Sequence, residues 1–139
     1  MKMDAQKSDA ALSTDVVTKQ FVVNYYTILN QSPENLYKFY GADSCHSFGD
    51  GELNPVVSAG QEGIRARIQA LNFRDCKVAL RNVDSQTTLD KCILIVATGT
   101  FTNAGATPRA FVQTFVLAPQ NPNGYYVRND LLRYLEDLS

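Results

Sequence analysis

The sequence predicts an α+β domain in which three helices pack on one face of a curved antiparallel sheet. Two observations lead to this prediction. Apolar residues recur at helical spacing in much of the first half of the chain, and after Asn72 they alternate with a period of two. Short turn sequences then divide the second half into four strands, and such short connections suit antiparallel neighbours.

Size and composition indicate one domain with a sizeable core. The chain has 139 residues, and 45% of them are hydrophobic. Thirteen Lys and Arg against 14 Asp and Glu give a net charge of -1, so the basic surface that phosphate binding requires is missing. The three cysteines have no spacing that suits a zinc site or a redox pair, and we expect buried thiols.

The first residues are polar and aperiodic. They predict a flexible amino-terminal arm over residues 1–12, followed by one domain over residues 13–139. No apolar run is long enough for a membrane span, and the start lacks the apolar stretch of a signal peptide. The expected location is therefore the cytosol or, in part, the nucleus, with no membrane partner.

Each of the three helices has its own signals. Ser13 or Thr14 can cap the first helix, and apolar residues including Val17 and Phe21 give it one apolar face as far as Asn30. The second helix begins after Ser32 with Pro33 at its first position, is short, and stops at Gly41. The third helix is marked by Ile64, Ile68 and Leu71.

Between the second and third helices the chain is rich in Gly, Asp, Ser and Asn. Residues 43–58 therefore predict a loop with one short strand near residues 45–48. Four long strands follow the third helix. Their alternating residues are Val78 and Leu80; Ile93, Ile95 and Ala97; Phe111, Phe115 and Leu117; and Tyr125, Val127 and Leu131.

Five strings of residues resemble one known family. They are FVVNYYTILNQSPENLYKFYG (21–41), GQEGI (60–64), LNFRDC (71–76), QTFVLAP (113–119) and YYVRNDLLRY (125–134). In this order they resemble the amino-terminal nuclear transport factor 2-like domain of the Ras-GTPase-activating-protein SH3-domain-binding proteins. The match spans nearly the whole chain, and its specificity lies in the colinear set, since any one string alone would be weak.

The resemblance implies a cone of three helices on a strongly bent antiparallel sheet, assembled as a homodimer through the sheet. It also implies a part in stress granules, the cytoplasmic ribonucleoprotein condensates of stalled translation. The domain of that family docks short Phe-Gly motifs of the FGDF type from partner proteins. RNA is bound there by other regions of the longer protein, so RNA is expected as a partner only through segments outside these residues.

The peptide-binding positions of the family can be assigned to residues of this chain one by one. Two of them, Val17 and Phe21, are one helical turn apart and share a face that can receive an aromatic ring. A plainer interpretation is that Phe21 and Phe39 only fill the core, but the resemblance favours the groove. The positions that the resemblance implies are Val17, Phe21, Asn24, Asn35, Lys38, Phe39, Phe115 and Tyr125.

Several positions depart from the family pattern. Lys38 stands where Arg is frequent, Asn35 replaces a larger apolar residue, Tyr125 replaces Phe, and Arg128 replaces His. The motif preference of the groove is therefore left open. Residues 48–50 themselves read FGD, so a loop that docks into its own groove is an alternative, although Gly follows where the motif needs its second Phe.

A small-molecule enzyme of the same fold is an alternative function. Such an enzyme needs an acid or base with a shifted pKa in its pocket. The single histidine, His46, is expected to be exposed in a polar loop, and Asp130 lies in a string whose family role is structural. Asp43, Asp50 and Glu52 have no metal-ligand pattern. We therefore expect no catalysis, no metal and no cofactor.

A nuclear transport carrier that binds a small GTPase and Phe-Gly nucleoporins is the other alternative. The strings at 21–41 and 125–134 favour the SH3-domain-binding family over it. Residues 91–101 add a second reason to expect the homodimer that the resemblance implies, because apolar residues occupy both faces of this strand. Those residues are Cys92, Leu94 and Val96 on one face and Ile93, Ile95 and Ala97 on the other.

Overall fold

The structure is a computed structural model that describes the backbone of residues 2–135 and the side chains of residues 14–135. Two helices, two strands and a further helix make up the first half, and the second half is a strand meander. In chain order they are α1 (Lys2–Gln31), η1 (Pro33–Phe39), β1 (Tyr40–Gly49), β2 (Val57–Ala59), α2 (Gly60–Leu71), β3 (Lys77–Thr87), η2 (Leu89–Lys91), β4 (Ile93–Thr102), β5 (Arg109–Pro119) and β6 (Tyr125–Tyr134).

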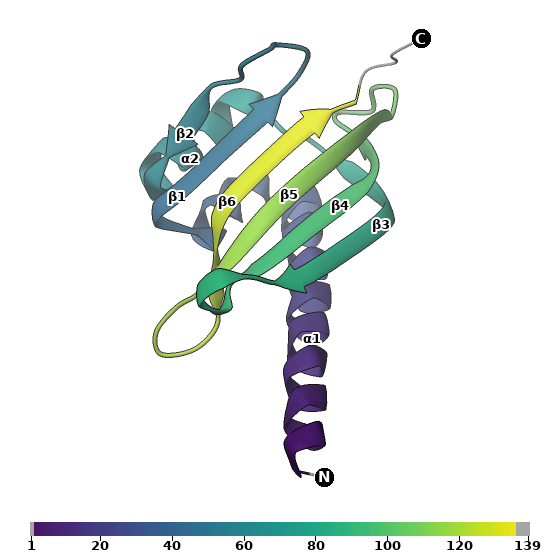
Figure 1. Cartoon of the computed structure of the whole chain (residues 1–139). Coiled ribbons are helices and arrows are strands. Elements are labelled where there is room, and N and C mark those ends of the chain that lie inside the picture. Colours follow the sequence, from purple (N-terminus) through teal and green to yellow (C-terminus); the bar gives the residue numbers. More distant parts are fainter. Residues whose placement is uncertain (1, 136–139) are drawn as a thin grey trace.

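The predicted fold class is confirmed. A bent sheet of order β2-β1-β6-β5-β4-β3 carries α1, η1 and α2 on one face and leaves the other face without a helix, as Figure 1 shows. One detail of the prediction is wrong: the sheet is mixed. The four strands β3 to β6 are antiparallel neighbours as expected, but β1 runs parallel to β6.

Helix α1 begins earlier than predicted. It starts at Lys2 and not at Ser13 or Thr14. The segment before Ser13 contains Ala, Lys, Gln and Met but no Gly or Pro, so it has no residue that opposes a helix. The side chains of residues 1–13 lie outside the described part, and the proposed division into an arm and a domain at residues 12 and 13 stays a prediction.

The second helix forms where the sequence placed it, but as a 3-10 helix. Pro33 occupies its first turn, and Ser32 precedes it without a side-chain capping bond. The helix ends at Phe39 because Tyr40 adopts an extended conformation and starts β1. This abrupt change of direction brings the end of η1 next to β6, where Tyr40 pairs with Val127.

The segment between η1 and α2 was predicted as a loop with one short strand near residues 45–48. The strand is there but is much longer than predicted, and only residues 50–56 form a loop. The strand β1 extends over ten residues, from Tyr40 to Gly49, and lies between β2 and β6. Its backbone therefore finds partners on both sides, which overrides the low strand propensity of its Gly, Asp and Ser residues. Ser44, His46 and Phe48 consequently point into the domain and are buried.

Strand β6 breaks the simple alternation that the sequence suggested. Val127 pairs with Leu117 and Asn129 pairs with Val116, so Arg128 is an extra residue, a β-bulge. The bulge shifts the inward-facing set by one position. Leu131, which was expected to follow Val127 on the buried face, is therefore 54% exposed, and Asp130, Leu132 and Tyr134 are buried.

The core lies between the helices and the concave face of the sheet. Its largest fully buried side chains are Phe101, Phe111 and Phe115, with aliphatic residues of α2, β4 and β5 around them. Ile64 and Ile68 attach α2 to this core, as the sequence predicted. Within residues 2–135 no helix is both long enough and apolar enough to cross a membrane.

Candidate functional site

A cluster of aromatic rings joins α1, η1 and β5. The ring of Phe21 meets Phe39 edge to face, with 5.7 Å between the ring centroids, and meets Phe115 in the same way at 4.8 Å. Tyr25 contacts all three rings, at 5.6 Å from Phe21, 5.4 Å from Phe39 and 5.0 Å from Phe115. Phe115 is fully buried, whereas Phe21 and Phe39 are half-buried. The cluster thus has a closed floor and an accessible edge.

The other peptide-binding residues that the resemblance implies differ in how far they are exposed. Val17 packs half-buried against the same core, one turn before Phe21 on α1. Asn24 and Lys38 are exposed, and Asn35 is half-buried on η1. The structure therefore gathers Val17, Phe21, Phe39 and Phe115 into one packed group.

Tyr125 joins this group through the sheet. It is 36% exposed and lies two residues before Val127, on the face that Val127 buries. Because Val127 pairs with Tyr40, the residue after the end of η1, Tyr125 is at the same end of the domain as Phe39. Among residues 14–135, the ring of Tyr125 makes no ring-to-ring contact with the cluster, so its part in the groove stays a prediction.

A buried polar network lies beneath the aromatic cluster. Asp130, which is 1% exposed, accepts hydrogen bonds at Oδ2 from the hydroxyls of Tyr40 at 2.5 Å and Tyr25 at 3.2 Å. Its Oδ1 accepts from the Gln113 amide at 2.9 Å, and Gln113 accepts from Tyr26 at 2.8 Å. The network ties α1 and the start of β1 to β5 and β6, which gives Asp130 the structural role that the sequence suggested.

Burial dominates the electrostatics of this network. It raises the pKa of Tyr25 and of Tyr40 well above the usual value of a phenol, and the Asp130 carboxylate raises each pKa further. The pKa of Tyr26 is raised by the same two causes. All three hydroxyls therefore stay protonated in the folded protein and serve as donors. Sequence reasoning did not identify these partners, because nothing in the sequence shows that a bulge turns Asp130 inward.

His46 does not lie in an exposed loop, so that expectation is wrong. It is on β1, is 4% exposed, and lies opposite Asp130 in the parallel pairing of β1 with β6. The space beside it, lined also by Tyr25, Gln113 and Phe101, measures about 10 Å³. A space of roughly 10 to 15 Å³ holds one water at most, so the space beside His46 has no room for a substrate.

The FGD string at residues 48–50 is not arranged as a docked ligand. Phe48 is 7% exposed and its ring packs in the core against Phe73, Phe101 and Tyr134. Asp50 forms an ion pair with Arg109 at 2.7 Å, which holds the pKa of this carboxyl below its usual range. Phe48 is thus a core residue, and the self-docking alternative is wrong.

Acidic and sulfur-bearing side chains are dispersed. Across residues 14–135, no three His, Cys, Asp or Glu side chains come together as a metal site would require. The Tyr126 hydroxyl instead donates to the Asp43 carboxylate, whose two oxygens lie 2.8 and 2.9 Å from it, and Asp43 also lies 3.7 Å from Arg128. Cys76 and Cys92 are buried free thiols, as expected, whereas Cys45 is half-buried.

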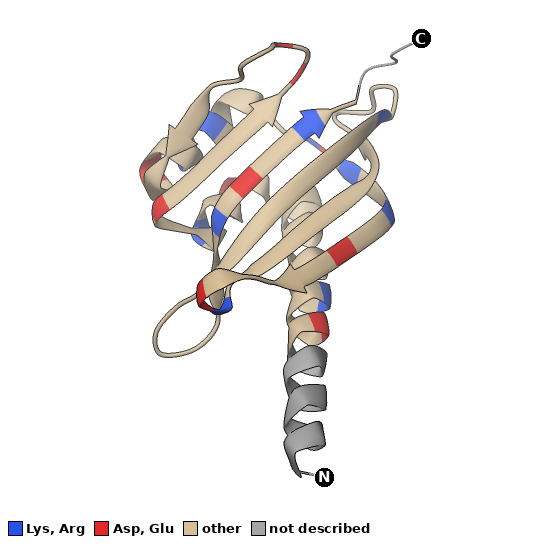
Figure 2. Ribbon diagram, viewed as in Figure 1, with Lys and Arg blue, Asp and Glu red and all other residues tan. Residues whose placement is uncertain are grey.

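The uncovered face of the sheet is poor in charge at its centre. Figure 2 shows β4 without a charged residue along its whole length. On this strand Ile93, Ile95 and Ala97 are buried beneath the helices, and Leu94 and Val96 on the other face are only half-buried. The sequence prediction of two apolar faces on β4 is therefore confirmed.

A family model matches most of the chain. The nuclear transport factor 2 (NTF2) domain matches residues 17–134. A G3BP-like protein of Schizosaccharomyces pombe is 40% identical over 129 residues, which are 93% of this chain. Nuclear transport factor 2 of Arabidopsis thaliana is 31% identical over 97% of this chain, and UBP3-associated protein BRE5 of Saccharomyces cerevisiae is 32% identical over 84% of it. The chain spans only 30%, 29% and 26% of these relatives' own lengths.

Solved structures agree with this match. Nuclear transport factor 2 from Cryptosporidium parvum superposes with a TM-score of 0.79 at 28% identity, over 87% of this chain and 94% of that chain. Yeast BRE5 superposes with a TM-score of 0.77 at 31% identity, over 87% and 95% of the two chains. The complex of the yeast deubiquitinase Ubp3 with its Bre5 cofactor gives a TM-score of 0.75 at 26% identity, over 88% and 98%.

Proposed function

Because this chain belongs to the nuclear transport factor 2 domain family, we propose that it is the dimeric protein-interaction domain of a stress-granule scaffold. Its ligands are FGDF-type Phe-Gly motifs of partner proteins. The similarity to a G3BP-like protein and to BRE5, and the solved complex of Ubp3 with Bre5, support a protein-interaction domain. The FGDF motif, the homodimer and the location in stress granules are the specific claims of this proposal. RNA would be bound by regions outside these residues.

The accessible aromatic edge carries the docking proposal. Phe21 and Phe39 keep part of their rings exposed although both pack against the core, and Val17 extends this surface by one helical turn. A peptide Phe placed there meets ring edges on two sides. Burial of one such ring contributes roughly 1.5 to 3 kcal/mol, so a motif with few anchors binds in the micromolar range.

Calorimetry with a synthetic FGDF peptide tests the groove. Phe39→Ala removes one wall, and we expect the affinity to fall at least tenfold. The matched control is Phe73→Ala, which removes a half-buried ring that packs against Phe48 and Phe101 at the other end of the core. Circular dichroism verifies that both variants fold. Equal peptide affinity for wild type and Phe39→Ala would show that Phe39 is only a core residue.

The interior supports a role other than catalysis. The space beside His46 measures about 10 Å³ and is lined by the rings of Tyr25, Phe48, Phe73 and Phe101. Asp130 is occupied by three donors and is shielded from solvent. We therefore propose that the domain is no enzyme and needs no metal or cofactor. Stoichiometric zinc in the purified protein would contradict this.

A transport carrier that binds a small GTPase is the second candidate. The relative of Arabidopsis thaliana named nuclear transport factor 2 and the similar structure from Cryptosporidium parvum favour it. A pull-down with this domain, scored separately for Ran and for FGDF-containing proteins, separates the two. Retention of Ran without FGDF proteins would replace the first proposal with the second. For the scaffold we expect recruitment from the cytosol to stress granules, and a steady nuclear-envelope location would favour the carrier.

A further inference from the structure

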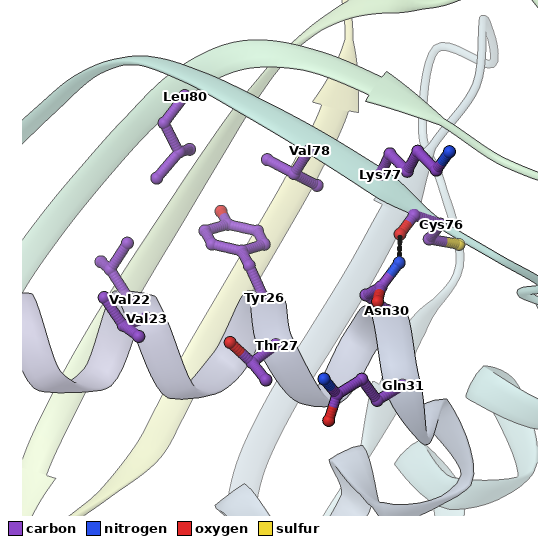
Figure 3. Close-up of a pocket in the computed structure, with 10 residues that line it drawn as sticks. All are labelled: Val22, Val23, Tyr26, Thr27, Asn30, Gln31, Cys76, Lys77, Val78 and Leu80. Carbon is purple, nitrogen blue, oxygen red and sulfur yellow. Dashed lines mark hydrogen bonds between the residues drawn. The ribbon is translucent and has the colours of Figure 1, made fainter.

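A lateral groove separates α1 from the edge strand β3, on a different face of α1 from the aromatic cluster. Its volume is about 430 Å³. Helix α1 is tied to β3 at both ends of the strand: Asn30 donates to the Cys76 carbonyl at 2.7 Å, and the hydroxyls of Thr14 and Thr87 lie 3.1 Å apart. Between these two contacts the groove stays open, as Figure 3 shows for the half next to Asn30.

The walls of the groove are mainly apolar and partly exposed. Val23 on α1 is 64% exposed and Leu80 on β3 is 39% exposed, and Val78 and Tyr26 are half-buried between them. The Tyr26 hydroxyl already bonds with Gln113, so its ring presents apolar surface to the groove. Apolar side chains of a ligand would therefore gain by entering.

The rim of the groove is a free sheet edge. Strand β3 is the last strand of the sheet, and within residues 2–135 it pairs with β4 alone. Along residues 77–80 its pairing is regular, and a register shift at Arg81 interrupts it. On the side away from β4, alternate N–H and C=O groups of such an edge have no strand partner and can bond with an added strand. The opposite edge, β2, has only three residues.

The groove and the edge together favour one kind of occupant. A strand added to residues 77–80 turns every second side chain toward the same face as Val78 and Leu80, which is the face that lines the groove. Lys77 is the single charged residue among those that line it. A second copy of this edge is unfavourable, because antiparallel pairing about Ala79 would place Lys77 opposite Arg81 of the other copy, and like charges repel.

We propose that residues 77–80 bind a short extended segment of a partner protein as an added strand. Its branched apolar side chains enter the groove at alternate positions, and an acidic side chain lies beside Lys77. This site is separate from the proposed FGDF groove, because it uses Val22, Val23 and Tyr26 of α1 and not Val17 and Phe21. The two sites would let one partner, or two partners, occupy opposite faces of the same helix.

A nine-residue synthetic peptide in which Val alternates with Thr, with Glu near one end, is the probe. Titration into the ¹⁵N-labelled chain is expected to shift amide resonances of β3 and to slow exchange at alternate amides of residues 77–80. Val23→Glu introduces a charge into the wall and should weaken binding at least tenfold. Its matched control, Val57→Glu, changes an equally exposed valine on the opposite edge and should leave affinity unchanged.

Three further comparisons change the peptide, the charge of Lys77, or a residue outside the groove. Replacing the central Thr of the peptide with Pro removes a main-chain donor and should abolish binding. Lys77→Glu should lower the affinity for the peptide, and a peptide with Lys in place of its Glu should restore the affinity for this variant. Phe39→Ala should have no effect on this peptide, which separates the site from the FGDF groove.

Three results would overturn the proposal. One is the absence of any shift at millimolar peptide, and another is equal affinity for wild type and Val23→Glu. The third is slowed exchange on β3 that appears without peptide and grows with protein concentration, since this would show that a second copy covers the edge.

Discussion

At the scale of single residues, Asp130 is the polar group on which the interior depends. Its two carboxylate oxygens accept from Tyr25, Tyr40 and Gln113, and these donors come from α1, the start of β1 and β5. Removing one partner of a buried hydrogen bond destabilises the folded state more than replacing both partners with apolar groups. One carboxylate therefore connects elements that are far apart in the sequence.

We predict that Asp130→Ala lowers the free energy of unfolding by at least ~2 kcal/mol, because it leaves several buried donors without an acceptor. Urea denaturation measures the change. The control is Asp43→Ala, which removes an exposed carboxylate bonded with Tyr126 and should cost less than ~0.5 kcal/mol. Similar losses in the two variants would mean that the network contributes little.

The buried tyrosines predict a loss of stability at alkaline pH. Burial raises the pKa of Tyr25 and Tyr40 in the folded state, whereas in the unfolded chain they titrate near the usual value of about 10. As pH rises past 10 the unfolded chain releases these protons first, so it is favoured. The contribution of these tyrosines should be constant below about pH 9, and stability should fall as pH rises above 10, with a shallower fall in Tyr40→Phe. Urea midpoints that stay level to pH 11 would contradict this.

At the scale of elements, two glycines show how local geometry decides the effect of one methyl group. Gly99 on β4 lies opposite the register shift at Arg81 of β3, and a Cβ there would be 2.1 Å from the carbonyl oxygen of Ala79. Gly63 lies inside α2, where an added Cβ meets no atom within 4 Å. The strand pair therefore requires glycine, and the helix does not.

We predict opposite effects for the two substitutions to alanine. Gly99→Ala must push β3 away from β4 and should cost about 1 to 3 kcal/mol. Gly63→Ala should stabilise the domain by about 0.5 to 1 kcal/mol, because alanine loses less backbone entropy in a helix. Thermal unfolding of the two variants, side by side with wild type, checks both signs. A stabilised Gly99→Ala would show that the strands can separate at no cost.

At the scale of the whole molecule, the uncovered face of the sheet supports the proposed homodimer. Leu94 and Val96 on β4 and Leu131 on β6 leave apolar surface without a helix above it. Figure 2 shows no charged residue along β4 and a single one, at one end, on β5, whereas β6 carries Arg128, Asp130 and Arg133. An apolar sheet face of this kind is usually covered by another element or another chain.

Light scattering should give the mass of a dimer at micromolar concentration, and Val96→Glu should give the mass of a monomer. The glutamate places a charge in the middle of the proposed interface, where it would be desolvated. Val56→Glu, at an exposed position in the loop before β2, is the control and should remain dimeric. A monomeric wild type would contradict the proposal of a dimer.

The sequence by itself determined the fold class, the three helices and the four meander strands. Their signals are local: the helical period of residues 17–28, Pro33 at the start of η1, and the alternation along β4 do not depend on distant residues. The resemblance also predicted that Val17, Phe21, Phe39 and Phe115 belong to one peptide-binding site. The structure brings these four side chains together.

Only the tertiary structure decided the features that depend on pairing between distant segments. Strand β1 reads as a loop because its residues have low strand propensity, and it forms because β2 and β6 supply partners on both sides. The bulge at Arg128 turns Asp130 inward and Leu131 outward, and the parallel register buries His46 opposite Asp130. Each of these outcomes depends on hydrogen-bonding and packing with residues tens of positions away, which no local period in the sequence records.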